Sequence, residues 1–301
     1  MKKILAISTK RTDAAEAMLA YLEGRMPQVQ IDYVVYDDLV ISFIDGKMRV
    51  SVENTGLDLA DYDMVYFKSS VVHDITATYV QYALRNDVKV TDVAKGAYAG
   101  GSKLYTYGII VPAGISVPNS LFAMPGRLVG AYDRYEQALG LPFVLKGIHA
   151  SRGDVNEVIR SRDDFDRVVA VALTSDKKAY LIGQSFVPND GDLRILVFGG
   201  EVQLVIHRQR ADESTHLNNT SQGGRATIVP IEELPAEVIA ASRSAATLSE
   251  IGIAGVDMVK DKETGKWYCF EVNEGPQMAT GSYRQSKWNE LAKYFMTELE
   301  K

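Results

Sequence analysis

The sequence predicts a mixed fold, in which an α/β domain precedes a region of α+β type. Segments typical of strands and of helices alternate over residues 1–95, which indicates a parallel sheet covered by helices. Glycines and prolines become frequent between Ala94 and Pro118, and strand-like segments dominate from Gly191 onward. The 301 residues are enough for two or three compact domains.

The composition of the chain argues against some classes of binding partner. Hydrophobic residues make up 46% of the chain and charged residues 24%, which is ordinary for a soluble globular protein. The net charge of -6 argues against a nucleic-acid or anionic-membrane partner, because affinity for these polyanions comes largely from Lys and Arg. No apolar run approaches the ~20 residues of a membrane span. The single cysteine, Cys269, excludes an internal disulfide, and we expect a cytoplasmic protein.

The elements of the first domain follow from hydrophobic periodicity and from cap and turn residues. The start, MKKILAIST, predicts a strand rather than a signal peptide, and the next segment predicts a helix that Asp13 caps and that ends near Gly24. A hairpin is expected to turn at Asp45-Gly46. The other expected elements are strands over 30–38, 63–70 and 87–93 and a helix over 73–86.

We place a domain boundary just before residue 96, where the glycine-rich stretch begins. Beyond it, LPFVLK predicts a strand, HASRGDVNEVI predicts a turn into another strand, and Ser161 caps a helix. A strand over 178–187 follows, and a hairpin turns at Gly199-Gly200. A helix over 235–252, two strands that flank DKETGK and a final helix over 286–301 complete the chain.

The strand WYCFEVNEGPQ, residues 267–277, ends on a polar cluster. Successive side chains of a strand point to opposite faces. Tyr268, Phe270 and Val272 are therefore expected on a buried face. The opposite face is expected to carry Trp267, Cys269, Glu271 and Asn273.

A metal site is expected where this strand meets its neighbour. If Asp261 pairs with Trp267, Asp257 lies opposite Glu271, and Asn273 lies further along the same face. Two carboxylates about 4 Å apart repel by roughly 4 kcal/mol at an effective dielectric constant of ~20, so a cation between them is favoured. Oxygen ligands of these types suit Mg²⁺ or Mn²⁺. The alternative is an exposed hairpin with scattered polar residues.

Two further stretches suit anionic groups. Lys146 ends a strand before a small-residue turn, in which backbone N–H groups from Ser151 to Gly153 can point at phosphate oxygens. This turn matches neither the P-loop nor the dinucleotide-binding motif, and a surface turn with a solvated lysine is the alternative. Arg194 brings a planar fork that can bind two oxygens of a carboxylate or phosphate, unless it makes only a surface ion pair contributing ~0–1 kcal/mol.

The hairpin that carries Arg194 is expected to bury one face, which consists of Leu193, Ile195 and Val197 together with Val202, Leu204 and Ile206. Asp192 and Arg194 point to the other face. This simple register puts His207, and not Arg208, on the face of Arg194, although a bulge would change the assignment.

The order of these signals resembles the ATP-grasp superfamily. Lys103, Lys146, QSFV, DLR, NNTSQGG, GVDMV and FEVNEGP follow one another in the chain, and the likeness covers Gly101 to Gln277. The chain looks most like the RimK-type carboxylate–amine ligases, with glutathione synthetase as a more distant relative. The resemblance implies a pre-ATP-grasp domain over 1–95, a central lobe with a phosphate flap over 96–180, and a C-terminal lobe with the metal site over 181–301.

The resemblance also implies roles for single residues. The residues that would contact ATP are Lys103, Lys146, Ser151 and Gly153 at the phosphates, Gln184, Phe186 and Val187 at the adenine, and Asp192 close to the nucleotide. Those that would face the transferred phosphate are Arg194, Arg208 and Asn219. Those that would hold Mg²⁺ or Mn²⁺ are Asp257, Glu271 and Asn273. The chain departs from the family pattern at ASRGDV, where the flap usually reads GSxGxG, and at Leu217, where an arginine is usual.

By this resemblance the chain is an ATP-dependent C–N ligase of the acid–amino-acid type, which forms an acyl phosphate and releases ADP and phosphate. The carboxylate and the amine can belong to a small molecule, a peptide or a protein tail, and MATGSYRQSKW is expected to border their pocket. Two alternatives stay open, a small-molecule kinase and a nucleotide-responsive binding protein without catalysis. The oligomeric state also stays open, with a homo-oligomer as one alternative.

Overall fold

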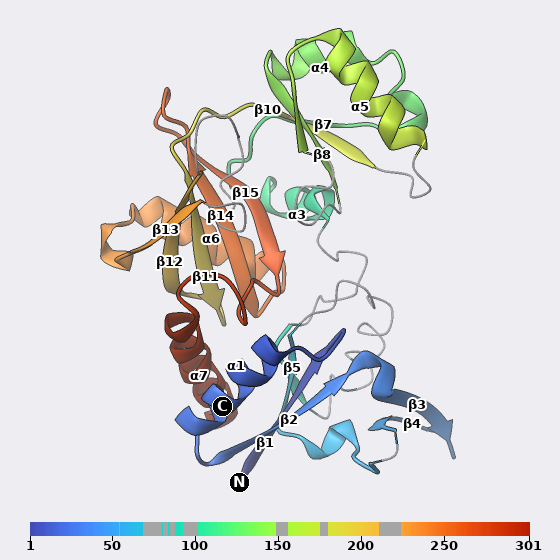
Figure 1. Cartoon of the computed structure of the whole chain (residues 1–301), viewed down its shortest axis with the longest axis vertical. Coiled ribbons are helices and arrows are strands. Elements are labelled where there is room, and N and C mark those ends of the chain that lie inside the picture. The colour runs from blue at the N-terminus through green and yellow to red at the C-terminus, as the bar shows by residue number, and fades with distance from the viewer. Residues whose placement is uncertain are drawn as a thin grey trace.

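The protein is described by a computed structural model that covers residues 1–53, 55–68, 80, 84, 88–92, 102–148, 156–174, 180–210 and 224–301. The predicted mixed fold is confirmed: the described residues contain one parallel sheet and two antiparallel sheets of four or five strands. Each of these three sheets carries helices (Figure 1). Short 3-10 helices lie at Tyr36–Asp38, Leu59–Asp61, Pro125–Arg127 and Ile231–Glu233.

The N-terminal sheet is parallel, with the order β2-β1-β5-β6. Its strands are β1 (Lys2–Ser8), β2 (Val29–Val35), β5 (Met64–Phe67) and β6 (Lys89–Val90). Helix α1 (Asp13–Arg25) is capped by Thr12, whose side chain accepts a hydrogen bond from the Ala15 N–H, and not by Asp13 as expected. The expected helix over 73–86 lies outside the described residues except for 80 and 84.

The hairpin predicted near Asp45-Gly46 is confirmed. It joins β3 (Leu39–Ile44) to β4 (Lys47–Val52). Both turn residues have positive φ angles, 52° for Asp45 and 71° for Gly46, as a two-residue hairpin turn of this type requires.

The middle sheet has the order β7-β10-β8-β9 and is covered by α4 (Tyr132–Leu139) and α5 (Arg162–Thr174), which close a separate apolar core. Its strands are β7 (Ser120–Phe122), β8 (Phe143–Gly147), β9 (Asn156–Ile159) and β10 (Leu181–Ser185). Strand β10 pairs with β7 and β8, so a boundary at residue 181 would separate it from its own sheet. We therefore propose that the middle lobe extends through Ser185.

The C-terminal sheet has the order β13-β12-β11-β14-β15. Its strands are β11 (Asp192–Phe198), β12 (Glu201–Gln209), β13 (Arg225–Val229), β14 (Ile253–Lys260) and β15 (Trp267–Glu274). Helices α3 (Lys103–Ile110) and α6 (Ala236–Leu248) close an apolar core on one face. Residues of the other face pack against α7 (Arg284–Glu300).

A bulge in the β11–β12 hairpin decides which side chains share a face. The register shifts between Leu196 and Val197, so that Asp192 lies opposite Arg208 and Leu193 lies opposite His207. Arg208 therefore shares the face of Asp192. The simple register expected from the sequence is wrong here. Leu204 and Ile206 belong to the α7 side of the sheet, and Val205 belongs to the core beside Leu193.

A second bulge lies in β15. Asp257 lies opposite Glu271 as predicted, but Met258 lies opposite Cys269, so Phe270 is the extra residue. Cys269 and Val272 consequently pack in the same core, and the expectation that Cys269 shares the face of Glu271 is wrong. The pairing of Asp261 with Trp267 is also wrong, because Trp267 lies opposite Lys260.

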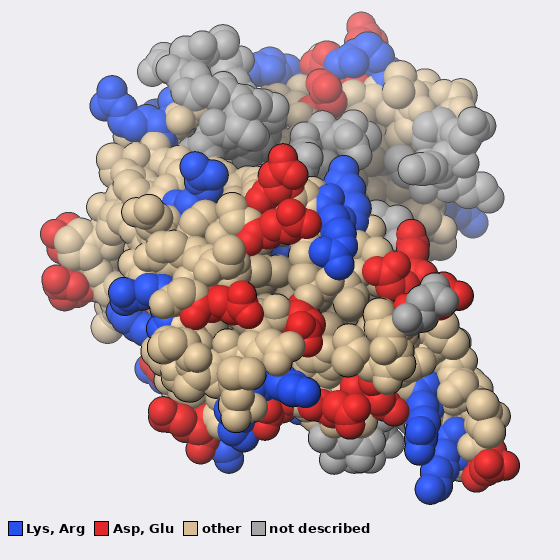
Figure 2. Space-filling model, turned by 60° about the horizontal axis from the view of Figure 1, so that its bottom comes forward, with Lys and Arg blue, Asp and Glu red and all other residues tan. Residues whose placement is uncertain are grey.

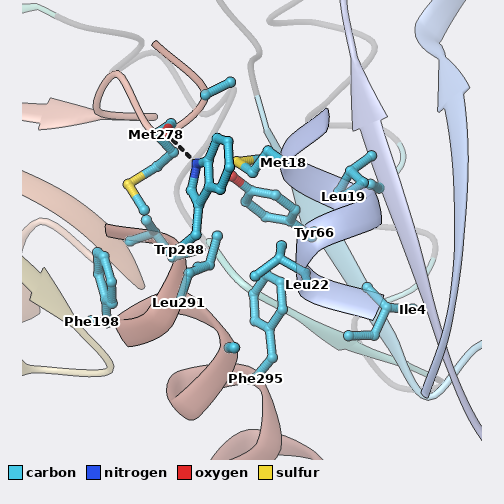
Figure 3. Packing of buried hydrophobic residues seen from close by; sticks show 14 of the residues in the cluster. Ile4, Met18, Leu19, Leu22, Tyr66, Phe198, Met278, Trp288, Leu291 and Phe295 are labelled. Carbon is cyan, nitrogen blue, oxygen red and sulfur yellow. Dashed lines mark hydrogen bonds between the residues drawn. The ribbon is translucent and has the colours of Figure 1, made fainter. Parts of the chain in front are cut away.

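The N-terminal domain and the C-terminal lobe share one hydrophobic core (Figure 3). Met18 of α1 and Tyr66 of β5 lie in the same cluster as Phe198 of β11 and as Trp288 and Phe295 of α7. The middle lobe has most of its apolar side chains in a cluster of its own. The shared core therefore holds the N-terminal domain and the C-terminal lobe together.

Charges of both signs are interspersed over the face of the molecule shown in Figure 2, and the coloured residues form no extended basic surface there. Within the described ranges, no helix is both long enough and apolar enough to cross a membrane.

Candidate active site

The candidate side chains gather on one face of the C-terminal sheet. In one row across the sheet, Arg194 of β11 lies opposite Asp257 of β14, which lies opposite Glu271 of β15. Asp192 and Arg208 form the neighbouring pair on the same face. Strand alternation produces this arrangement, because Leu193 and Ile195 point into the core while Asp192 and Arg194 point away from it.

Two arginines bind the carboxylate of Asp257. Arg194 binds it in a bidentate manner, with Nη2 2.9 Å from Oδ2, and Arg208 Nη2 lies 3.0 Å from Oδ1. Arg208 also binds Asp192 through two hydrogen bonds of 2.7 Å. Although burial acts to raise the pKa of Asp257, the two guanidinium groups hold it below its ordinary value. Burial raises the pKa of Asp192 to about 6, with Arg208 opposing the shift and the charge of Asp257 adding to it.

The side chain of Glu271 meets the first of the two predicted lysines. Lys103 Nζ lies 3.0 Å from Glu271 Oε1. Lys103 is the first residue of α3, directly after the cap residue Ser102, and its N–H donates to the carbonyl of Ile148 just beyond β8. The start of α3 is thereby fixed between the end of β8 and the edge strand β15.

The second lysine, Lys146 of β8, reaches the same place from the middle lobe. Its Nζ lies 4.8 Å from the ring centroid of Phe270, the bulged residue of β15, within the range of a cation–π contact. Burial, together with the like charge of Lys103, lowers the pKa of Lys146 to about 8, against the opposing effect of Glu271 and Asp257. Lys103 starts a helix that packs on the C-terminal sheet, and Lys146 belongs to the middle sheet, so the two lysines converge on the carboxylates from different sheets.

The bulge at Phe270 is held from the side of α3. A bulge interrupts the ladder of backbone hydrogen bonds. The Tyr107 hydroxyl donates to the Phe270 carbonyl at 2.8 Å. Gln184 Nε2 in turn donates to the Tyr107 hydroxyl at 2.7 Å and to Ser120 Oγ at 3.2 Å. Gln184 Oε1 is buried and has no hydrogen-bond partner among the described residues.

The segment after Gln184 connects the middle lobe to β11. Phe186 is half-buried and Val187 is buried. The Val187 carbonyl accepts a hydrogen bond of 2.8 Å from Asn189 Nδ2, and the Gly191 N–H donates to Asn189 Oδ1. Side-chain-to-backbone bonds therefore shape this connection.

The donor set fits a hard divalent cation. Asp257 and Glu271 are neighbours across the ladder, and Asn273 Nδ2 lies 3.3 Å from Asp257 Oδ2. The part of the chain that the structure describes contains no group of three or more His, Cys, Asp or Glu side chains placed to hold a metal ion. Two carboxylates and an amide oxygen would leave coordination positions for other oxygen ligands, as Mg²⁺ sites commonly do.

Three of the expected site residues, Ser151, Gly153 and Asn219, lie outside the described residues, as does Leu217. Sequence reasoning missed the roles of Tyr107 and Phe270, because no periodicity marks a bulge or the side chain that holds it. It also missed Lys287, which reads from the sequence as one polar residue at a helix start.

A pocket opens beside Arg194 and Arg208. Its walls come from the sheet face and from the segment that follows β15. The lining includes Leu196, Ile206, Ala226, Pro276, Gln277, Gly281, Ser282 and Lys287. Within MATGSYRQSKW, the segment expected to border the substrate pocket, Gly281, Ser282 and Lys287 line this pocket.

Solved structures with the same fold are ATP-grasp ligases. One is the ligase PsnB with a phosphomimetic variant of its minimal precursor, Mg and ADP (TM-score 0.70, 16% identity, 99% of each chain covered). Another is the macrocyclase MdnC with the precursor peptide MdnA from Microcystis aeruginosa (0.70, 12%, 98% of this chain and 99% of that chain). A third is D-alanine–D-alanine ligase from Bacillus anthracis with ATP (0.67, 15%, 100% and 98%).

A search of the curated proteins found no match to this chain. The profile of the RimK-like ATP-grasp domain matches residues 101–296, which is more than half of the 301 residues. This range contains both lysines and the whole C-terminal sheet. The chain therefore belongs to the RimK-like ATP-grasp family.

Proposed function

We propose that this protein is an ATP-dependent carboxylate–amine ligase, which forms an amide bond through an acyl phosphate and releases ADP and phosphate. The observation that carries the proposal is the convergence of Lys103, Lys146, Arg194 and Arg208 on one sheet face around Asp257 and Glu271. Cations and acids gathered in this way can bind polyphosphate and metal together.

We propose that ATP binds between the middle and C-terminal lobes. ADP in the PsnB structure and ATP in the D-alanine–D-alanine ligase structure support nucleotide binding, and the approach of Lys103 and Lys146 to Glu271 and Phe270 supports this location. Lys103 and Lys146 would contact the phosphates, together with Ser151 and Gly153. The segment of Gln184, Phe186 and Val187 would bind the adenine, and the unpaired acceptor Gln184 Oε1 suits a donor such as the adenine amino group. Asp192 would lie near the nucleotide.

We propose that Asp257, Glu271 and Asn273 hold Mg²⁺, which is present in the PsnB complex with ADP. Bound there, the ion would offset charge on the phosphates and orient them. The cations that now neutralise the two carboxylates are the same side chains that the nucleotide would engage. Binding of nucleotide and metal would thus exchange one set of charge pairs for another.

In the proposed first step, a substrate carboxylate oxygen attacks the γ-phosphorus, the bond from this phosphorus to the bridging oxygen breaks, and ADP leaves. Arg194 and Arg208 would bind the transferred phosphoryl oxygens, with Asn219 beside them. In the second step an amine nitrogen attacks the acyl carbon, and phosphate leaves with its acyl oxygen. Positioning of the reactants and exclusion of water from the acyl phosphate would be the main work of the protein.

We propose the substrates only as a class of molecule, a peptide or a free amino acid. PsnB and MdnC are bound to precursor peptides in their structures, which favours a peptide as one substrate here. D-alanine–D-alanine ligase favours a free amino acid as the alternative. The pocket beside Arg194 is open to solvent and would accept a side chain or a chain end of either.

The test is a screen of amino acids and short peptides for ADP release, followed by mass analysis of the product. We expect ADP only when a carboxylate and an amine are both present, and no turnover in a Glu271→Ala variant that keeps its circular dichroism spectrum. Stable phosphorylated product without an amine would point to a kinase instead. Nucleotide binding without ADP formation across the screen would point to a binding protein. Unchanged turnover in Glu271→Ala would overturn the metal assignment.

A further inference from the structure

Lys287 is a buried cation outside the set that we assign to ATP and metal. It lies in the first turn of α7 and lines the pocket beside Arg194 and Arg208. Only 4% of its surface is exposed. Buried ammonium groups are normally paired, because their desolvation costs several kcal/mol.

No acidic side chain of the described residues pairs with Lys287. Its Nζ donates to the backbone carbonyls of Gln277 and Thr280, the second at 2.6 Å. The charged groups that act on it are both cations, Arg194 and Arg284, and together with burial they lower its pKa to about 8. The arginines of the pocket differ, because Arg194 and Arg208 are already paired with carboxylates. Lys287 therefore brings a positive charge that its described surroundings do not balance.

The ammonium group is held in place by the segment that forms one wall of the pocket. Besides the two bonds from Lys287, Trp288 Nε1 donates to the Met278 carbonyl at 2.8 Å (Figure 3). Trp288 belongs to the core that joins the N-terminal domain to the C-terminal lobe. An ammonium group has three donors, and two of them are used by carbonyls, so one is left for a ligand.

We propose that this pocket binds a carboxylate group of the substrate, with Lys287 as its counter-ion. The inference rests on the proposed ligase function, which already requires a carboxylate, and deepens it by naming Lys287 as the side chain that would select that group. The pocket adjoins Arg194, which we place at the transferred phosphoryl group, so a carboxylate bound here belongs to a molecule at the reaction centre.

The character of the walls favours an organic carboxylate. Leu196, Ile206, Ala226 and Pro276 provide apolar surface beside the three cations, and no acidic side chain lines the pocket among the described residues. Apolar surface suits carbon atoms next to the charged group, as in an amino acid or a peptide end. One unbalanced ammonium group matches the single charge of a carboxylate.

The test uses the full chain without ATP, so that it does not depend on turnover. The probes are N-acetyl-L-alanine, which carries one carboxylate, and N-acetyl-L-alaninamide, its neutral counterpart. Dissociation constants are measured by ligand-observed NMR titration at pH 7. We expect the wild type to bind the carboxylate about tenfold more tightly than the amide, since a hydrogen bond to a charged group typically contributes more than a neutral one.

Four variants separate the charge of Lys287 from its structural role. Lys287→Met removes the charge, and Lys287→Gln keeps donors for the Gln277 and Thr280 carbonyls. Both should bind the two probes within about threefold of each other, because the counter-ion is absent. Lys293→Met is the matched control, since Lys293 lies on the same helix but is 63% exposed and pairs with Glu290. It should keep the wild-type preference. Ala226→Leu, which fills the pocket from another wall, should weaken both probes.

Several results would overturn the inference. A wild type that binds both probes equally, or neither, excludes a carboxylate site whether or not the protein is a ligase. Retention of the preference in Lys287→Gln would make Lys287 only a support for the segment it holds. If both Lys287 variants fail to fold, Ala226→Leu decides the location, because unchanged carboxylate binding in that variant would place the site elsewhere. Conversely, carboxylate selectivity without any ligase activity would reject the proposed function alone.

Discussion

Replacement of Asp257 by Asn should destabilise the protein strongly, apart from any effect on activity. Asp257 is 7% exposed and binds both Arg194 and Arg208. Asn keeps the shape of the side chain and one acceptor oxygen but removes the negative charge. Arg194 would then have lost its only ion-pair partner among the described residues, and Arg208 would keep only Asp192.

The expected loss of stability in Asp257→Asn can be estimated from the burial of its ion pairs. Removal of one partner of a buried ion pair typically costs about 3–5 kcal/mol, because the remaining charge stays desolvated. The neutral oxygen that Asn retains places the expected loss near the lower limit, about 3 kcal/mol. Asp257 also acts on Lys146, which the like charge of Lys103 affects as well, and Arg194 acts on Lys287. Loss of the Asp257 charge therefore leaves the repulsion among these cations less balanced.

Urea unfolding followed by circular dichroism measures the effect. The matched control is Asp133→Asn, which breaks an exposed ion pair with Arg162 and should leave the unfolding midpoint nearly unchanged. The loss in Asp257→Asn should persist in 0.5 M NaCl, because salt screens buried pairs much less than exposed ones. A midpoint shift no larger than that of Asp133→Asn would refute the view that the arginines depend on Asp257.

Three more predictions concern the surroundings of the site. Gly252→Ala should lower the unfolding midpoint in urea severely, because its Cβ would lie 1.7 Å from the Thr91 carbonyl oxygen and backbone would have to shift. Tyr107→Phe should cost roughly 1–3 kcal/mol in the same assay, since Gln184 loses a buried hydrogen-bond partner. Calorimetry should find that ATP affinity falls as pH rises through about 8. The pKa of Lys146 is lowered to about 8, so above this pH the lysine loses its proton and with it the charge that would bind phosphate. Lys146→Met should abolish that decline, and a decline of equal size in this variant would contradict the assignment.

Much of the fold could be predicted because its signals are local. Alternation of strands and helices indicated the parallel sheet, and Asp45-Gly46 and Gly199-Gly200 marked hairpins that the structure contains. The pairing of Asp257 with Glu271 was also predicted, although the assumed start of that ladder was wrong. The extra residue, Phe270, shifts the ladder between its start and the carboxylates.

The two bulges could not be predicted, because nothing in the local sequence marks them. Gln203 and Phe270 are the extra residues, and each reads as an ordinary strand position. Their effect is nevertheless large, since a one-residue shift moves every later side chain to the other face. Arg208 consequently joins Asp192, and Cys269 enters the core. Tertiary contacts decide such shifts, as the bond from Tyr107 to the Phe270 carbonyl illustrates.

The contribution of Lys287 was hidden for a related reason. In sequence it stands among polar residues at the start of a helix, where a solvated lysine is usual. The burial of Lys287 depends on the segment from Gln277 to Thr280, which folds back over the start of the helix. Carbonyl groups of this segment accept hydrogen bonds from the Lys287 ammonium group. A single sequence contains no periodic signal for such a contact.

The most direct test of the central claim is to follow the oxygen atoms of the substrate carboxylate. With the carboxylate substrate from the ADP-release screen labelled at both oxygens with ¹⁸O, the proposed reaction moves one label into the released phosphate and leaves the other in the amide. Mass spectrometry of both products should find one ¹⁸O in each for every ADP formed. Unlabelled phosphate, or a label recovered in AMP, would contradict an acyl phosphate made by attack on the γ-phosphorus.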